Sequence, residues 1–332
     1  MDNSEFMAII ENTQKLLREN TEWQTRWAGF ATDICSNKKL IESIRSSFRE
    51  WSPLYVYVTT TSAKNAPKSI GFDLRYMGQA VAKLTGNKDG NHKLSTKYTK
   101  SKSYDKSNLD NFGCNLRLSN VDWRGDEATE FRNYFNKRKG RREGNRSNDE
   151  HRLESLILTE FFKTESKDKA LLNVQPVTPI KNVRFPMPTN IKASNHKKVE
   201  IGYGHIDILT RVGRGRATHL CIMELKDVNK STEPPKDTVK QAVAYTTFIR
   251  ELLRSDSGKL WWKLFGFSGE IPNQLVLYAA CVMPPNNNND YSFGGLALPV
   301  DRDTIVLHYL YFKEENNKLK FLSTSIPGIE IR

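Results

Sequence analysis

The sequence predicts a mixed α/β fold, an α+β arrangement around a mixed sheet, preceded by an additional N-terminal α+β domain. Runs with helical spacing of apolar residues alternate with short β-like runs, and a basic stretch near residue 143 separates two such sets. In the second set the elements are expected at residues 151–163, 171–177, 204–209, 220–226, 237–254, 274–283 and 304–312. We therefore expect one domain over residues 1–143 and another over residues 144–332.

The N-terminal domain is expected to combine helices, strands and one long loop. Its helices are expected at residues 5–19, 34–49 and 127–136, and its strands at residues 54–59, 70–74 and 116–123. Residues 85–111 are rich in Lys, Ser, Asn and Gly, which predicts an exposed basic loop. We expect this domain to recognise a target or to bind a partner protein.

The first helix of the second domain carries a candidate carboxylate. Residues 147–150, Ser-Asn-Asp-Glu, form a capping box that predicts the helix start, and Ile157 and Phe161 lie at core spacing. Glu154 lies on the flank of this apolar face. Its ordinary interpretation is a boundary glutamate. Its functional interpretation is an extra carboxylate delivered to a metal site, with Glu150 one turn earlier as the alternative.

The runs at residues 204–209 and 220–226 are expected to pair as a hairpin, because the glycines between them supply the positive φ that a turn requires. Such pairing brings Asp207 close to Glu224. Side chains alternate along a strand, so Glu224 and Lys226 share one face, at the end of a buried strand where the sheet is expected to meet solvent.

Two carboxylates beside a lysine are the minimum equipment for metal-dependent cleavage of a phosphodiester. Mg²⁺ prefers oxygen ligands and keeps several waters, so Asp207 and Glu224 with a substrate phosphate would complete its shell, and Mn²⁺ would be a substitute. A nearby ammonium, that of Lys226, would hold or activate the attacking water. Any one of these residues alone is more often an ordinary surface group.

A long amphipathic helix is expected at residues 237–254, after the Pro234-Pro235 break. Gln241 and Tyr245 are four residues apart and so share one of its faces. They are interpreted either as a polar pair on a surface helix or as groups that flank the metal site and contact a nucleic-acid strand.

In this order of elements, residues 147–285 resemble the PD-(D/E)XK phosphodiesterase superfamily of restriction enzymes and repair nucleases. The Gly-x-Ile-Asp context, the Glu-x-Lys form and the Gln-x-x-x-Tyr helix are similar to the RecB-like branch. The resemblance implies a restriction-endonuclease-like α-β-β-β-α-β core and a Mg²⁺-dependent deoxyribonuclease, many relatives of which serve in restriction or anti-phage defence. It implies that Asp207 and Glu224 bind metal, with Glu154 as the helix carboxylate. It also implies that Lys226 is the catalytic lysine and that Gln241 and Tyr245 are accessory residues.

The charge of the chain favours a nucleic-acid partner. Its 51 Lys and Arg residues exceed its 38 Asp and Glu residues, which gives a formal net charge of +13 at pH 7. The residues expected to contact nucleic acid are Lys137, Arg138, Lys139, Arg141, Arg142, Arg214 and Arg216. A looser run of lysines between residues 93 and 106 fits a solvated linker equally well.

Other functional classes are disfavoured or stay open. No phosphate-loop or dinucleotide motif is present, no apolar stretch approaches the ~18 residues of a membrane span, and the four cysteines are far apart. We therefore expect a cytoplasmic protein with reduced cysteines. DNA is the expected substrate, with RNA as an alternative, and a homodimer is compatible with double-strand cutting. The alternatives are a non-catalytic nucleic-acid-binding protein and a nuclease subunit that requires a helicase or sensor partner.

Overall fold

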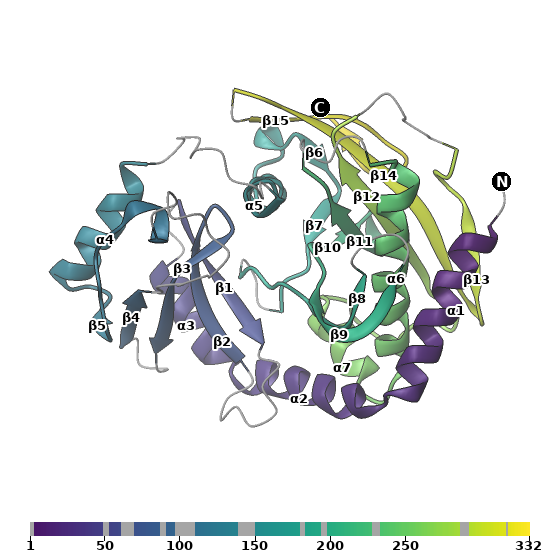
Figure 1. Ribbon diagram of the computed structural model, residues 1–332, viewed down its shortest axis with the longest axis horizontal. Coiled ribbons are helices and arrows are strands. Elements are labelled where there is room, and N and C mark those ends of the chain that lie inside the picture. The colour runs from purple at the N-terminus through teal and green to yellow at the C-terminus, as the bar shows by residue number, and fades with distance from the viewer. Residues whose placement is uncertain are drawn as a thin grey trace.

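The structure, a computed structural model, describes residues 3–48, 53–60, 70–86, 91–96, 110–138, 150–179, 183–193, 198–227, 233–285, 292–316 and 318–332. Within these ranges the chain forms a mixed α/β fold with seven α-helices and four β-sheets. Figure 1 shows two larger sheets with helix α5 (Glu150–Phe161) between them. The mixed α/β class expected from the sequence is confirmed.

The largest sheet is mixed and has the strand order β13-β14-β12-β11-β10-β7, with β15 paired to the second half of β14. Its strands are β7 (Val174–Pro176), β10 (Ile208–Val212), β11 (His219–Leu225), β12 (Val276–Met283), β13 (Ala297–Val300), β14 (Asp303–Glu315) and β15 (Lys318–Thr324). Strands β11, β12 and β14 run parallel, and the other pairs are antiparallel. Central parallel strands are buried on both faces, which explains the continuous apolar runs of β11 and β12.

Helices cover both faces of this sheet. Cys281 of β12 shares a core with Val243 of helix α6 (Pro235–Arg254). The preceding residue of β12, Ala280, shares a different core with Ile157 of α5. Because successive side chains of a strand point to opposite faces, α6 and α5 pack on opposite sides of the sheet.

The second sheet is an antiparallel meander near the N-terminus. Its strands are β1 (Leu54–Thr60), β2 (Ile70–Tyr76), β3 (Gln79–Gly86), β4 (His92–Thr96) and β5 (Val121–Asp122), paired in sequence order. Helices α3 (Lys38–Phe48) and α4 (Asp126–Asn136) contact this sheet.

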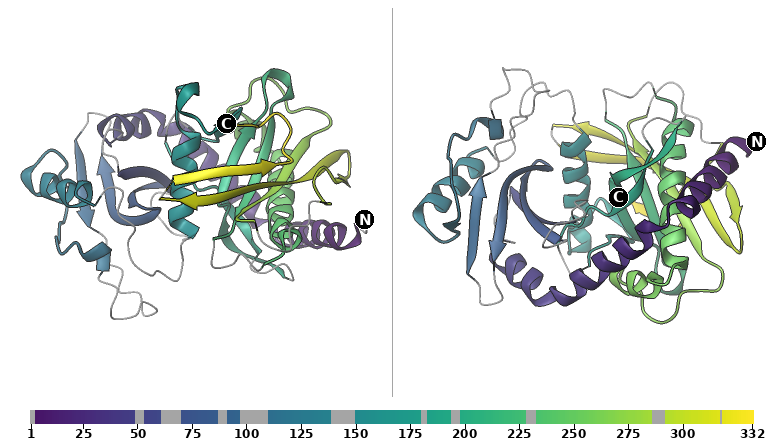
Figure 2. Two further views of the ribbon diagram at one scale, coloured as in Figure 1. Left: turned by 90° about the horizontal axis from the view of Figure 1, so that it is seen from above. Right: turned by 60° about the horizontal axis from the view of Figure 1, so that its bottom comes forward.

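The first two helices connect the two parts of the molecule. Helix α1 (Ser4–Glu19) packs on α6, and α2 (Glu22–Ser36) contacts α7 (Gly258–Leu264). Figure 2 shows α1 and α2 running from the larger sheet toward the N-terminal one. The N-terminal helices therefore share a core with elements from the second half of the chain.

Two short two-stranded antiparallel sheets complete the fold. Strand β8 (Pro188–Ala193) pairs with β9 (Val199–His205), and β6 (Leu171–Leu172) pairs with β16 (Glu330–Ile331). The β8–β9 pair touches the N-terminal elements, because Trp27 Nε1 donates to the Pro188 carbonyl oxygen at 3.0 Å and Tyr203 OH donates to the Thr60 carbonyl oxygen at 3.0 Å.

Local predictions differ from the structure in several places. The expected strand at residues 204–209 is interrupted at Ile206 and Asp207, between the end of β9 and the start of β10, so Asp207 precedes the strand that forms the hairpin. No helix was expected over residues 22–33, yet α2 buries Trp23, Trp27, Phe30 and Ile34, whose helical spacing is the signal that finds it. The expected loop at residues 85–111 contains β4, which forms because Leu94 is buried against β3. The expected strand at residues 116–123 is reduced to the two residues of β5.

Most other expected elements are present within a few residues of their predicted bounds. They include α1, α4, α5, α6, β1, β2, β12 and β14. Cys114, Cys221 and Cys281 are buried free thiols, whereas Cys35 is exposed. Among the described helices, none is both long and apolar enough to cross a membrane.

Candidate active site

Asp207 and Glu224 lie at the open end of the β10–β11 hairpin, away from its turn. The antiparallel register pairs Ile208 with Met223, so one further step places Asp207 opposite Glu224. The Leu225 backbone N–H donates to Asp207 Oδ2 at 2.9 Å, which ties the aspartate to the end of β11. The hairpin therefore brings the two predicted carboxylates to the same end of the sheet.

Lys226 belongs to the same cluster. Its Nζ donates to Glu224 Oε1 at 3.0 Å. Glu224 and Lys226 are only 7% and 6% exposed, whereas the sequence analysis expected them where the sheet meets solvent. They are buried because α6 packs over β11, while Met223 and Leu225 point into the core on the α5 side.

Gln241 and Tyr245 both lie on the face of α6 that covers this cluster. Gln241 Oε1 accepts a hydrogen bond from Lys226 Nζ at 3.2 Å. Tyr245 OH accepts one from the Ala193 backbone N–H at 3.3 Å. Both side chains are buried, so the interpretation of a polar pair on an exposed helix surface is wrong. The lysine is held by one group from β11 and one from α6.

Both candidate glutamates of α5 act on the cluster. The negative charge of Glu154, which is buried, contributes to the raised pKa of Asp207. The negative charge of Glu150 contributes to the raised pKa values of Glu224 and Lys226. Helix α5 therefore brings two carboxylates toward the hairpin end, and the choice between Glu150 and Glu154 as the helix carboxylate stays open.

The two hairpin carboxylates are held in an environment that disfavours their charge. Burial, followed by the charge of Glu224, raises the pKa of Asp207 well above its usual range. Burial also raises the pKa of Glu224, although Lys226 opposes this shift. Paired acids with raised pKa values at the end of a sheet are typical of sites that bind a cation or transfer a proton.

Lys226 remains positively charged. Burial by itself lowers the pKa of its ammonium, but Glu224 outweighs that effect, and Glu150 and Asp207 add to it, so the pKa rises. An ammonium of this kind cannot serve as a base near neutral pH. It can donate hydrogen bonds and offset negative charge.

The donor set suits a magnesium ion that keeps most of its water. Within the part of the chain that the structure describes, no three His, Cys, Asp or Glu side chains form a ready cage for a metal. Mg²⁺ needs no such cage, since one or two carboxylates with waters and substrate phosphates complete its shell. Asp207 and Glu224 would supply those carboxylates, and Glu154 is the additional acid whose charge reaches Asp207.

The N-terminal sheet also reaches this site. The pKa of His205, at the end of β9, is lowered first by burial and then by the charge of Arg75 from β2. A register shift in the β2–β3 pairing occurs at Arg75, and such bulges redirect a side chain. The β2–β3 turn approaches α5 so closely that a Cβ on Gly78 would lie 2.1 Å from the His151 carbonyl oxygen. Sequence reasoning missed Arg75, because nothing near it in the chain indicates this proximity.

The basic residues expected to contact nucleic acid do not gather at one place. Lys137 and Arg138 follow α4 beside the N-terminal sheet, where Arg138 Nη1 donates to Tyr134 OH at 3.1 Å. Lys139, Arg141 and Arg142 lie outside the described residues. Arg214 and Arg216 lie at the turn end of the β10–β11 hairpin, which is the opposite end of β10 from Asp207.

Comparison with known proteins adds no relative. No protein-family model, no curated protein and no solved structure matches the chain. A function for this chain is therefore inferred from the geometry and chemistry of the hairpin end itself.

Proposed function

We propose that the protein is a Mg²⁺-dependent nuclease of the PD-(D/E)XK type that hydrolyses phosphodiester bonds in DNA. One observation carries this proposal: Asp207 and Glu224 face each other across a hairpin end, and Glu224 is bonded to the ammonium of Lys226 at 3.0 Å. Two charge-disfavoured carboxylates beside a fixed cation suit a site that binds a metal and a phosphate together.

The order of elements around the site supports the same proposal. Helix α5, strands β7, β10 and β11, helix α6 and strand β12 follow one another as α-β-β-β-α-β, and all four strands belong to one sheet. The resemblance seen in the sequence implies this order for the family core. Among the described residues 150–332, seven further strands, β6, β8, β9 and β13 to β16, and helix α7 are additions to that order.

Each residue has a chemical role in the proposed reaction. Asp207 and Glu224 would hold the metal, and Glu154 or Glu150 adds negative charge beside them. A bound Mg²⁺ would lower the pKa of water and neutralise charge on the phosphate. Lys226, kept protonated by Glu224 and oriented by Gln241, donates hydrogen bonds to the attacking water or to the phosphate. Tyr245 fixes α6 to β8 through Ala193.

The net positive charge favours a polyanionic substrate, and the N-terminal sheet is placed to contact it. The charge of Arg75 from β2 contributes to the lowered pKa of His205, and His205 is two residues before Asp207 in the chain. Binding would be strongly salt-dependent, because phosphate contacts release counterions. A role in restriction or anti-phage defence is the proposed setting, on the strength of the resemblance alone.

The decisive experiment compares Lys226→Met with Lys240→Met in a cleavage assay. Lys240 is a matched control, since its side chain is 11% exposed and its Nζ bonds Glu5 at 2.8 Å and Asp237 at 3.0 Å, away from the cluster. Linear, circular and single-stranded DNA would be incubated with Mg²⁺, Mn²⁺ or EDTA. We expect metal-dependent cleavage that falls at least a hundredfold in Lys226→Met only.

The other outcomes favour different functions. Cleavage of the circle would identify an endonuclease, and sparing of the circle an exonuclease. Equal cleavage by Lys226→Met and wild type would refute the assignment of the site. No cleavage by a folded wild type that binds DNA would favour a partner-dependent subunit or a binding module.

A further inference from the structure

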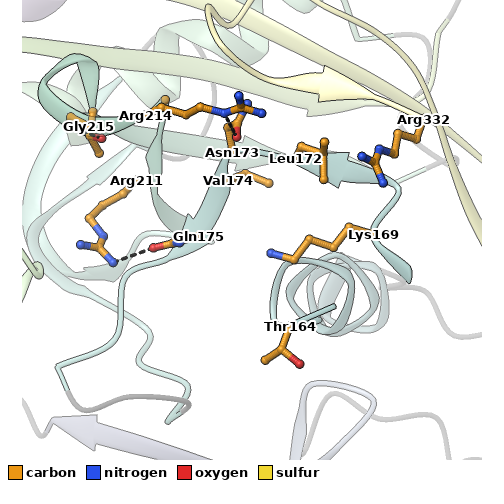
Figure 3. Close-up of a pocket in the computed structure, with 12 residues that line it drawn as sticks. Thr164, Lys169, Leu172, Asn173, Val174, Gln175, Arg211, Arg214, Gly215 and Arg332 are labelled. Atoms are coloured by element: carbon orange, nitrogen blue, oxygen red, sulfur yellow. Dashed lines mark hydrogen bonds between the residues drawn. The ribbon is translucent and has the colours of Figure 1, made fainter. Parts of the chain in front are cut away.

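A second charged site lies at the other end of the same hairpin. A cavity of about 530 Å³ opens beside the edge strand β7 and the β10–β11 turn. Figure 3 shows its basic side chains, which come from the segment after α5, from β10, from the hairpin turn and from the C-terminal end: Lys169, Arg211, Arg214 and Arg332. Among the described residues that line it, none is acidic. The cavity has the volume of a small-ligand site and a positive lining.

Arg211 is the best-fixed cation of this cavity, and its charge is uncompensated. Its Nη1 donates to the Gly266 carbonyl oxygen at 2.6 Å and its Nη2 to Gln175 Oε1 at 2.8 Å, both neutral acceptors. Its Nε is buried without a hydrogen-bond partner. Burial lowers the pKa of the guanidinium, and no neighbouring carboxylate opposes this shift. A partly buried cation without a counter-ion gains from a bound anion.

The position of this guanidinium depends on a glycine. Gly266 has a φ of 85°, and a Cβ there would lie 2.7 Å from Arg211 Nη1. Phe267, the next residue, places its ring 5.9 Å from the guanidinium carbon. The loop after α7 therefore holds Arg211 in one orientation before any ligand arrives.

Lys169 and Arg214 add to the positive lining, to which Arg332 also belongs. In Figure 3 the Lys169 side chain extends toward Gln175, and within the described residues its ammonium has no hydrogen-bond or ion-pair partner. Arg214 Nε donates to Asn173 Oδ1 at 2.6 Å, and its Nη2 lies 3.2 Å from Glu330 Oε1. Glu330 offsets part of the charge of Arg214 and none of that of Lys169 or Arg211.

The lining also indicates which part of a ligand is recognised. Leu172 and Val174 are its apolar side chains, and no aromatic ring lines it, so the cavity offers no platform on which a base would stack. Lysine and arginine with amide and hydroxyl donors suit phosphate oxygens. We propose that this cavity binds the phosphate groups of a free phosphate ester or of a nucleic-acid strand. The proposal does not rest on the nuclease assignment.

The test measures ligand binding to wild type and to two double variants by titration calorimetry in buffer that contains EDTA. Lys169→Gln/Arg214→Gln removes two lining charges, and Lys167→Gln/Lys320→Gln removes two exposed charges outside the lining. One probe is inorganic pyrophosphate and the other is a 5′-phosphorylated oligodeoxynucleotide. We expect the dissociation constant of at least one probe to rise about tenfold or more in the first variant and by less than twofold in the second.

The two probes distinguish the two sources of phosphate. Binding of pyrophosphate that depends on Lys169 and Arg214 assigns the cavity to free phosphate esters. Binding of the oligonucleotide alone, with the same dependence, assigns it to a nucleic-acid strand. Equal weakening in both double variants, or no binding of either probe by wild type, overturns the proposal. Because EDTA prevents metal-dependent cleavage, none of these outcomes depends on the nuclease assignment.

Discussion

The two ends of the β10–β11 hairpin carry charge of opposite sign. At the open end, Asp207 and Glu224 are acids whose pKa values are raised by burial and by neighbouring charge. At the turn end, Arg211 is a cation bonded only to neutral acceptors. Asp207, which immediately precedes β10, and Arg211 within it are four residues apart, about 13 Å at about 3.3 Å per residue.

This difference shows how a short hairpin can serve two electrostatically distinct sites. The strand pairing separates the charges by a fixed length, so neither end neutralises the other. Most of the surrounding charge comes from other segments: Lys226 and α5 at the open end, and Lys169 and Arg214 at the turn end. Each end is left with charge that a ligand of opposite sign would compensate, a cation at one and an anion at the other.

Replacement of Asp207 by Asn is expected to have the largest effect. Cleavage should fall about a thousandfold or more, because the carboxylate proposed to bind the metal is lost. Stability should change in the opposite direction. Because folding raises the pKa of this carboxyl, the acid opposes folding at pH 8, which lies above the usual carboxyl pKa. An amide removes that penalty while keeping an acceptor for the Leu225 N–H. Thermal denaturation at pH 8 in EDTA should show a rise in Tm of about 2 °C.

Asp303→Asn is the control for this prediction. Burial alone would raise the pKa of Asp303, but hydrogen bonds from Arg254, Arg250 and the Leu275 N–H outweigh it and lower the pKa. Its ionised form therefore stabilises the fold, and the variant should lower Tm. A lower Tm for Asp207→Asn as well would show that the open end is not held in a charge-disfavoured state.

Gly266→Ala is expected to lower the free energy of unfolding by about 2 kcal/mol, because it disturbs the packing of Arg211 at the turn end. Its added methyl group would require both a positive φ and a displacement of Arg211. Gly269→Ala is the matched control, because Gly269 also has a positive φ of 76° but nothing within 4 Å of its Cβ position. Urea denaturation of both variants measures the difference. Equal losses would mean that Arg211 is not confined by Gly266.

The smallest expected effect is a loss of stability in acid that comes from one buried histidine. His308 of β14 is buried against Tyr278, and burial lowers its pKa to about 4. The unfolded chain binds a proton near the usual value, so stability falls as pH drops through 6.5 toward 4, by about 1 kcal/mol between pH 7.5 and 5.5. His308→Gln should reduce this slope in urea titrations. An unchanged slope would place the acid sensitivity elsewhere.

The elements that the sequence predicted best are those whose signal is local. Helix α6 was expected because its apolar residues recur at helical spacing after a Pro-Pro break. Strand β12 was expected because a continuous apolar run of this length is typical of a buried strand. Strand β4 was missed because its stability comes from pairing with β3, which its own polar sequence does not show. The helix α2 was missed although its tryptophans carried the pattern.

The chain's sequence by itself determined that Glu224 and Lys226 share one face of a strand and that Gln241 and Tyr245 share one face of a helix. Side-chain period is a property of the local backbone, so it follows from spacing alone. Only the tertiary structure decided that these faces meet, that Arg75 of the N-terminal sheet approaches His205, and that Lys169 lies across a cavity from Arg211. Such proximity depends on how helices and sheets pack over long sequence separations, and spacing along the chain carries no record of it.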